Sequence, residues 1–469
     1  MDRNSGPRQD SPLVPTRPIP PSRGPTMNAP RTLGIAGTGI LVLFFAAGAV
    51  TAQQFDDLGP ALPLFGESSN LAYLSPANLS DGGEILAGTS SATDLNADNN
   101  PSGNQAFIWS CATGAIGLGS VPVPGAESIY QVLGSTASGL SADGGTAFGF
   151  CDYQYPDPGA PGTEQVTQVG FVWTPADGMQ SLGYIAGDPS HGVTTFPMAI
   201  SADGSVVTGE STDNLALHAF RWTKATGIWG LGTPPADASA GTAISADGSV
   251  ITGTYLYGPS LLTGDLFQWT QATGITHIPL PAGDTYPTEA FASADGSVVV
   301  GISRPDSSGQ ANHVFRWTQA TGAAVLPFLP GDDLAFGLST TPDASVIVGW
   351  STSASGTAPL HGFRWSVDSG LQTLGTLPGQ QGDTIPSGVS ADGRVIVGGA
   401  GGEAFIWTVD WGIWPLKDIL ECLGTGDPLP GWTLISATAI SADGRVITGL
   451  GVNPDGQPSA WRVVLGQEP

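Results

Sequence analysis

A four-residue motif, Ser-Ala-Asp-Gly, recurs along the chain and constrains its fold more than any other feature. Serine can accept a hydrogen bond at the start of a type I turn, and glycine after aspartate can take the left-handed conformation that completes a bulged hairpin. Counted from the aspartate, with Asp81 as the first, neighbouring copies lie 44 to 62 residues apart, a period that suits a four-stranded unit. The motif predicts eight tight turns, which begin at Ser80, Ser141, Ser201, Ser245, Ser293, Thr341, Ser390 and Ser441. In the Thr341 copy Ala344 replaces the glycine, which costs about 1 kcal/mol if its backbone is left-handed.

An alternating Phe-x-Trp pattern follows each turn. Residues two apart on a strand share a face, so the Phe and Trp rings point inward while the residue between them, such as Arg221, Arg316 or Arg364, points the other way. In the eighth copy, Ser459-Ala460-Trp461, only the Trp is kept. The other seven pairs are Phe107/Trp109, Phe171/Trp173, Phe220/Trp222, Phe267/Trp269, Phe315/Trp317, Phe363/Trp365 and Phe405/Trp407.

Each repeat contains four short strands, and the chain is expected to form an all-β, eight-bladed β-propeller of four-stranded antiparallel blades. The 68 glycines and 39 prolines favour short strands and tight turns over helices. The last repeat ends near Trp461 without a fourth strand, whereas residues 55–63 resemble the fourth-strand segments at 115–119 and 372–378. We therefore expect the N-terminal strand to complete the last blade and close the ring, which leaves no open sheet edge between the first and last units.

These repeats resemble the HAF family, a group of putative extracellular repeat proteins with a His-Ala-Phe motif. The motif occurs literally at His218-Ala219-Phe220, with variants that begin at Gln105, His313, His361 and Glu403. The resemblance covers nearly all of the chain beyond residue 52. It implies export and repetition, and it supplies no catalytic residues.

The N-terminal region is predicted to lie outside the fold. Residues 1–26 form a Pro- and Arg-rich leader that need not be translated, because Met27 can serve as the start. Residues 27–52 combine a basic start, an apolar stretch and small residues near Ala52, which is typical of a secretory signal peptide. Residues 53–469 then form one propeller domain, secreted to the extracellular space or the periplasm, with no membrane insertion after cleavage.

The charge balance narrows the classes of partner. The whole chain has a formal charge of −26, and removing residues 1–52 leaves nine basic and 38 acidic residues, or −29. Such a surface repels phosphate backbones and anionic lipids, so nucleic acid and membrane surfaces are not expected as partners. The odd number of cysteines, Cys111, Cys151 and Cys422, predicts no disulfide framework.

Length variation points to a working surface. The second-to-third strand connections are longest at residues 89–104, 151–168 and 254–265, and in a meander they share a face with the fourth-to-first crossovers. Binding sites often lie where loops of a repeat ring vary. We therefore predict that a ligand binds this face.

Within that face, aromatic rings and carboxylates outside the repeated motifs suit a sugar, since rings stack on pyranose faces and acids accept hydroxyl hydrogens. Ordinary packing at the rim explains the same residues. The ligand-binding candidates are Tyr153, Tyr155, Glu210, Tyr255, Tyr257, Asp284, Tyr286, Glu289, Asp332 and Trp350, with Asp152 and Asp265 near them in sequence. The histidines of the His-Ala-Phe register are expected to serve the scaffold.

One loop has a weak calcium pattern. Asp94, Asn96, Asp98 and Asn100 place oxygen side chains at alternate positions, as calcium loops do. Asn99 stands where such loops usually need glycine, and Gln105 stands where they usually have glutamate, so a solvated polar loop is the favoured explanation. No other cofactor is indicated.

Two functions fit these features. The first is a secreted, non-catalytic binding or structural module for a glycan, an envelope component or another protein. The alternative is a carbohydrate-active hydrolase or lyase on a propeller scaffold, which would need two carboxylates at a defined separation.

Overall fold

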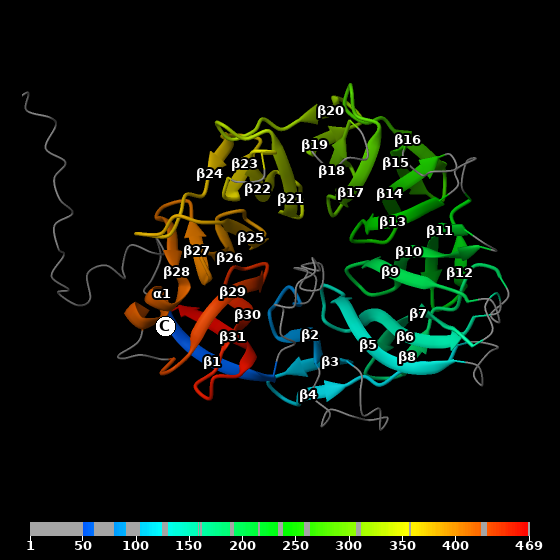
Figure 1. The fold of residues 1–469 in the computed structure, drawn as a ribbon, viewed down its shortest axis with the longest axis horizontal. Coiled ribbons are helices and arrows are strands. Elements are labelled where there is room, and N and C mark those ends of the chain that lie inside the picture. Colours follow the sequence, from blue (N-terminus) through cyan, green and yellow to red (C-terminus); the bar gives the residue numbers. More distant parts are fainter. Residues whose placement is uncertain are drawn as a thin grey trace, which may run out of the picture.

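The chain folds into eight antiparallel sheets arranged as the blades of a ring, an eight-bladed β-propeller, as the repeats predict (Figure 1). The computed structural model describes residues 50–60, 79–90, 104–123, 130–157, 159, 162–187, 192–213, 216–232, 238–257, 263–305, 311–355, 358–423 and 429–467. In each blade the first strand lies nearest the centre of the ring and the fourth lies at the rim (Figure 1).

The blades are numbered one to eight in chain order. Blade one has three strands and an isolated antiparallel bridge between Leu79 and Leu86 on its inner side. The strands of blades one to four are β2 (Ile85–Ser90), β3 (Gln105–Ser110), β4 (Gly114–Gly117); β5 (Gln131–Leu140), β6 (Ala147–Pro156), β7 (Glu164–Thr174), β8 (Gly178–Ser181); β9 (Thr195–Ile200), β10 (Val206–Asp213), β11 (Ala216–Thr223), β12 (Gly227–Gly230); and β13 (Ala238–Ile244), β14 (Val250–Tyr257), β15 (Thr263–Thr270), β16 (Gly274–Ile278).

Blades five to eight continue the same order, and one helix, α1 (Leu416–Leu423), lies between blades seven and eight. The strands are β17 (Tyr286–Ala292), β18 (Val298–Arg304), β19 (His313–Thr318), β20 (Gly322–Val325); β21 (Leu334–Thr340), β22 (Val346–Thr352), β23 (His361–Ser366), β24 (Gly370–Thr373); β25 (Thr384–Val389), β26 (Val395–Ala400), β27 (Glu403–Thr408), β28 (Gly412–Pro415); and β29 (Thr433–Ile440), β30 (Val446–Val452), β31 (Pro458–Gln467), β1 (Val50–Pro60).

Blade eight is built from both ends of the chain. The strand order is β29-β30-β31-β1, and Asp57 of β1 pairs antiparallel with Trp461 of β31. The predicted ring closure is therefore confirmed. Strand β1 begins at Val50, inside the segment predicted as a signal peptide, so cleavage after Ala52 would leave residues 53–60 of this strand in place.

A glycine and an aromatic ring face each other in the middle of every blade. The second strand contributes the glycine, the third strand contributes the ring, and the two are paired in register, so the ring covers the backbone where no side chain stands. The pairs are Gly88–Phe107, Gly149–Phe171, Gly209–Phe220, Gly253–Phe267, Gly301–Phe315, Gly349–Phe363, Gly398–Phe405 and Gly449–Trp461.

This register corrects the sequence alignment of the last repeat. Trp461 stands at the Phe position of Phe-x-Trp, and Val463, which pairs with Ile447, stands at the Trp position. Alignment by residue type alone places Trp461 with the other tryptophans, whereas the strand pairing places it with the phenylalanines. The larger indole is fully buried against the extra apolar side chains that surround blade eight.

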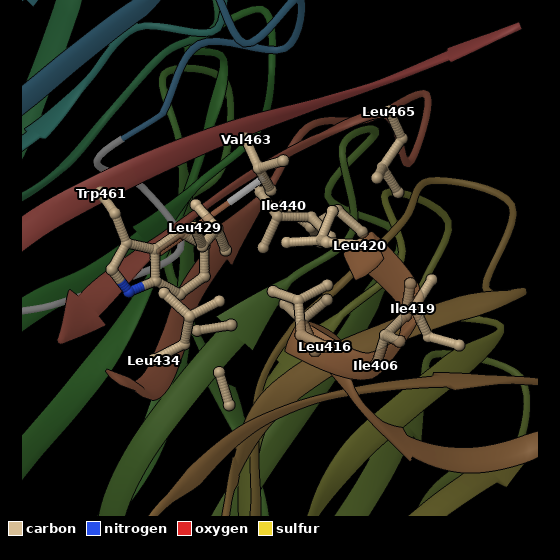
Figure 2. Packing of buried hydrophobic residues seen from close by; sticks show 14 of the residues in the cluster. Ile406, Leu416, Ile419, Leu420, Leu429, Leu434, Ile440, Trp461, Val463 and Leu465 are labelled. Atoms are coloured by element: carbon tan, nitrogen blue, oxygen red, sulfur yellow. The ribbon is translucent and has the colours of Figure 1, made fainter. Parts of the chain in front are cut away.

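The helix α1 supplies part of that extra core. Leu416 and Leu420 are buried in one cluster with Trp461, Val463 and Leu465 of β31, and Phe55 of β1 packs against the same cluster. Figure 2 shows the β31 side chains pointing into the space that the α1 side chains also fill. The composition favoured strands over helices, and α1 is a local insertion that covers the closing blade.

The Ser-Ala-Asp-Gly turns are held together internally. In blade five the Ser293 hydroxyl donates to Asp295 (2.6 Å) and accepts from the Val298 amide (2.9 Å), while the Ser297 amide donates to Asp295 (2.9 Å). These hydrogen bonds, that of Ser293 first, lower the pKa of Asp295 to about 2. Ala344, at the glycine position of its turn, has the predicted positive φ of 49°.

Successive turns are joined by backbone hydrogen bonds that run around the ring. The amide of the second turn residue donates to the carbonyl of the second residue in the next turn: Ala202 to Ala246, Ala246 to Ala294, Ala294 to Pro342, Ala391 to Ala442, Ala442 to Asp81 and Asp81 to Ala142. Pro342 has no N–H, so this series does not continue from blade six to blade seven. Asp81 makes the hydrogen bonds that alanine makes in the other turns, so it occupies the alanine position of its turn and Gly82 the aspartate position. Seven of the eight turns therefore have the aspartate, where the sequence motif predicts eight.

The middle residue of Phe-x-Trp links neighbouring blades. Arg316 Nε donates to the Ala344 carbonyl (3.2 Å), and Arg364 Nε donates to the Gly393 carbonyl (3.1 Å), in each case the last residue of the next blade's turn. Arg462 makes the same contact across the closure, with Nη2 2.8 Å from the Gly83 carbonyl oxygen. At these positions the middle residue of the motif is thus an inter-blade contact.

The paired glycines Gly337 and Gly349 of blade six give a matched test of the strand packing. A methyl group at Gly349 would collide with the Phe336 carbonyl oxygen, whereas one at Gly337 would meet its nearest atom, on Val314, at 3.4 Å. We expect Gly349→Ala to lower the free energy of unfolding by about 1–3 kcal/mol or more, and Gly337→Ala to have a much smaller effect. Chemical denaturation measures both, and equal losses would contradict this account of the core.

Candidate functional site

The connections of the propeller fall on two faces. The loop face, as defined here, carries the second-to-third strand connections and the fourth-to-first crossovers; the turn face carries the Ser-Ala-Asp-Gly and third-to-fourth strand turns. Hydrogen bonds show that the two kinds of loop-face connection lie together. Asp284, from the β16–β17 crossover, bonds Ser303 at the end of β18 and His313 at the start of β19. The candidate ligand-binding residues lie on or near this loop face.

Blades five and six carry the same Asp-Ser-His arrangement, here called the crossover clamp. In blade five Ser303 Oγ donates to Asp284 Oδ2 (2.6 Å), and His313 Nδ1 lies 2.9 Å from both carboxylate oxygens. The Asp284 side chain is only 1% exposed. The clamp thus connects the β16–β17 crossover to the end of β18 and the start of β19.

Blade six repeats the clamp at the same spacing. Ser351 Oγ donates to Asp332 Oδ2 (2.6 Å), and His361 Nδ1 lies 3.0–3.1 Å from the two oxygens. In both blades the serine hydroxyl bonds the carboxylate and not the imidazole, so the three groups do not form a nucleophile relay, in which the imidazole takes the serine proton. The candidate carboxylates Asp284 and Asp332 thus have internal partners, which accounts for His313 and His361 of the His-Ala-Phe register.

In blade two the candidates Tyr153 and Tyr155 belong to an aromatic group. Tyr130 stacks on Tyr155 with ring centroids 5.1 Å apart and meets Tyr153 edge-on at 6.1 Å. Tyr153 is buried, and burial raises the pKa of Tyr155. The group braces the β6–β7 hairpin, which continues to the pair Pro156–Glu164 and so reaches three residue pairs further than β10–β11 or β14–β15.

In blade four Tyr255 and Tyr257 form a second group. Their rings meet edge-on at 5.0 Å, and Tyr255 also stacks on Phe267 at 6.1 Å. Burial, followed by the Tyr257 hydroxyl and the nearby Asp265 charge, raises the pKa of Tyr255. Asp265 pairs with half-exposed His277 (2.8 Å). This blade has Tyr255 and Asp265 at the positions where blade five has Ser303 and His313.

Glu210 and Trp350 occupy the same repeat position, immediately after the central glycine of the second strand. Trp350 packs on Phe336 at 4.5 Å, and burial raises the pKa of Glu210. Glu289 lies on the innermost strand of blade five, and although part of its side chain is exposed, the surrounding strands raise its pKa as well. Glu210, Trp350 and Glu289 are thus positions at which the blades differ in sequence. The contacts of the candidate residues place them in separate groups, each within its own blade.

In blade five the Tyr286 ring lies beneath the guanidinium of Arg304, which is not among the candidates chosen from the sequence. The Arg304 guanidinium carbon stands 4.4 Å from the centroid of the Tyr286 ring, and the two residues are cross-strand partners. Arg304 ends β18 at the loop face, beside the crossover clamp. Its signal in the sequence was its position: it is the one basic residue directly at the end of a second strand.

The calcium candidates Asp94, Asn96, Asp98 and Asn100 lie outside the described residues. Within the part of the chain that is described, no three His, Cys, Asp or Glu side chains gather in a way that could hold a metal ion. The same residues contain no helix long and apolar enough to cross a membrane.

No protein-family model and no curated protein sequence matches the chain. Similar solved structures include an oligogalacturonate lyase in complex with manganese, with 13% identity over 68% of this chain and 86% of that one (TM-score 0.42). TolB from Acinetobacter baumannii has 12% identity over 82% and 81% (TM-score 0.35). A prolyl endopeptidase has 13% identity over 73% of this chain and half of its own length (TM-score 0.45). At these identities none of them bears on the activity of this chain.

The crossover clamp predicts a stability effect. Asp332→Ala leaves the buried Ser351 hydroxyl and the His361 Nδ1 without their partner, so the free energy of unfolding should fall by about 1–3 kcal/mol. The exposed Asp368, in the β23–β24 turn of the same blade, makes no side-chain hydrogen bond or ion pair among the described residues, so Asp368→Ala should change it by less than about 0.5 kcal/mol. Urea denaturation compares the two variants. Equal stabilities would mean that the clamp contributes nothing to the scaffold.

Proposed function

We propose that the chain is an exported, non-catalytic binding or structural module whose loop face holds an extracellular glycan, an envelope component or another protein. One contrast carries the proposal. The polar groups that recur from blade to blade are used inside the scaffold, as the Ser-Asp turns, the inter-blade arginines and the crossover clamps show. The groups that differ between blades are found on the loop face.

The two faces differ in regularity. On the turn face, seven turns share one hydrogen-bonding pattern between serine or threonine and aspartate. On the loop face, blade two extends its hairpin, blade four replaces the clamp with Tyr255 and Asp265, and blade five adds Arg304 over Tyr286. A rigid ring that presents variable groups on one face is a common architecture for binding.

The contacts of the acidic candidates favour binding over hydrolysis. A carbohydrate-active hydrolase needs two carboxylates free to reach the scissile bond from opposite sides. Asp284 and Asp332 are buried and hydrogen-bonded to serine and histidine, so neither is free for that work. The alternative enzyme would need two other carboxylates, from residues such as Glu210, Glu289 and Asp152.

The proposed location of the protein, outside the cell or in the periplasm, is inferred from the sequence. The predicted signal peptide at 27–52 and the resemblance to the HAF family both support export to the extracellular space or the periplasm. The formal charge of −29 beyond residue 52 disfavours nucleic acid and anionic membranes as partners.

A binding screen tests this proposal. Residues 50–469 would be presented to immobilised glycans, to cell-envelope fractions and to secreted proteins, and captured ligands would be confirmed by thermal shift, because a ligand that prefers the native state raises the melting temperature. The loop-face variant Tyr257→Ala/Tyr286→Ala should lose the captured ligand. The turn-face variant Val367→Ala/Val409→Ala, which also removes exposed apolar side chains, should keep it.

Two outcomes would contradict the proposal. Loss of binding in the turn-face variant but not in the loop-face variant would place the ligand on the wrong face. Turnover of any glycan in the panel, abolished by Glu289→Gln, would favour the enzyme.

A further inference from the structure

Blades five and six offer a comparison within one molecule, because they share the crossover clamp with the same spacing. At the next register position outward, blade five pairs Tyr286 with Arg304, whereas blade six pairs Leu334 with Thr352. The backbones match, since the Thr285 amide donates to the Arg304 carbonyl (3.0 Å) and the Asp333 amide donates to the Thr352 carbonyl (3.1 Å). The blades therefore differ in side-chain chemistry at one corner of the loop face.

The blade-six corner is satisfied by the protein itself. Thr352 Oγ1 donates to the carbonyls of Pro359 (3.1 Å) and Ala358 (3.3 Å) in the connection that follows. Thr352 is buried, and its hydroxyl has no donor hydrogen to spare for a carboxylate at this corner.

The blade-five corner is not satisfied in this way. Across the part of the chain that is described, the Arg304 guanidinium has no hydrogen bond and no ion pair, and its one close partner is the Tyr286 ring. Other arginines, such as Arg316, Arg364 and Arg394, bond carbonyls or an aspartate. An arginine left without an acceptor is unexpected in a chain with 40 acidic residues.

Two buried polar atoms at this corner also lack partners. Arg304 Nε is buried without an acceptor, and Asn312, one residue beyond the Ser303–His313 pair on the facing strand, is 1% exposed and has a buried Oδ1 without a donor. Native proteins satisfy most buried polar groups, so these two exceptions require an explanation. An acceptor group on a ligand would satisfy Arg304, whereas Asn312 Oδ1 is itself an acceptor and would need a donor.

The chemistry of the corner selects the group that binds. A guanidinium offers coplanar N–H donors that match the two oxygens of a carboxylate, and stacking on Tyr286 fixes the plane of those donors before the ligand arrives. Asp284, the acidic group of the crossover clamp in the same blade, is held by His313 and Ser303. More distant acids repel a single carboxylate weakly, because charges separated by more than about 8 Å are screened at physiological ionic strength.

We propose that Arg304, held over Tyr286, is a binding site for a carboxylate group of the ligand on the loop face. The inference rests on the proposed function and narrows it, because the ligand must carry a carboxylate, either on an acidic sugar or on a peptide. A polyanion such as nucleic acid stays excluded, since it would bring many charges against an acidic surface.

Two pairs of probes test the site and separate the sources of the carboxylate. Glucuronate is compared with glucose, and trialanine with a free C-terminus is compared with its C-terminal amide, by isothermal titration against residues 50–469. In at least one pair the acid should bind about tenfold more tightly than its neutral counterpart, as expected for a charge-assisted hydrogen bond. Binding of neither acid, or equal binding of acid and neutral compound in both pairs, overturns the proposal.

Variants taken from the protein's own repeat complete the test. Tyr286→Leu/Arg304→Thr installs the blade-six pair in blade five and should abolish the acid preference while the melting temperature shows that the chain still folds. Arg304→Lys keeps the charge but loses the planar fork, and should weaken the acid by about tenfold. Arg445→Thr removes an exposed arginine paired with Asp443 and should change nothing. An acid preference that survives Tyr286→Leu/Arg304→Thr, or is lost in Arg445→Thr, also overturns the proposal.

The outcomes also separate this inference from the broader one. Loss of the acid preference with capture of a glycan or protein retained on the loop face would leave the proposed function standing. Loss of all capture would remove both.

Discussion

The pairing of β1 with β31 is the interaction on which the rest of the structure depends. It joins residues about 400 positions apart into one sheet and covers the edge that β31 would otherwise present. A ring of blades whose first and last members are not joined is an open stack, and its end blades would lose a neighbour. The closing blade also has a buried apolar cluster in which α1, Trp461 and Phe55 pack together, so apolar packing and the backbone pairing support each other (Figure 2).

Around the rest of the ring, two repeated devices on the turn face add polar contacts to the apolar packing between neighbouring blades. Backbone hydrogen bonds run from turn to turn, and an arginine or glutamine between Phe and Trp reaches the next turn, as Gln268 does to the Gly296 carbonyl (2.6 Å). Arg462 continues the second device from blade eight to blade one. Because these contacts satisfy the polar groups of the turn face, the loop face is free to vary in length and chemistry without loss of the ring.

The sequence predicted the features that depend on local rules repeated many times. Turn residues with fixed backbone preferences and alternating apolar residues gave the eight blades, the closure at Asp57 and the positive φ of Ala344. Features that depend on one contact were missed. Trp461 was placed by residue type, although its register is set by Gly449, and Asp81 was counted with the turn aspartates although it takes the alanine position.

The candidate site shows the same division. Asp284 and Asp332 were chosen as non-repeated acids, yet both stand 19 residues before a serine and 29 before a histidine, and that shared spacing was the available signal of the crossover clamp. Arg304 was passed over because a lone arginine has no motif. Its interest arises from Tyr286 beneath it and from the acceptor it lacks, and only the folded arrangement reveals either.

Removal of β1 tests the central claim most directly. Two chains, one starting at Val50 and the other at Ala61, would be compared by thermal unfolding, and a peptide of residues 50–60 would be added to the shorter one. The account predicts that the shorter chain melts at a clearly lower temperature or fails to fold, and that the peptide restores part of the loss. Equal melting temperatures without the peptide would show that the first strand does not hold the ring closed.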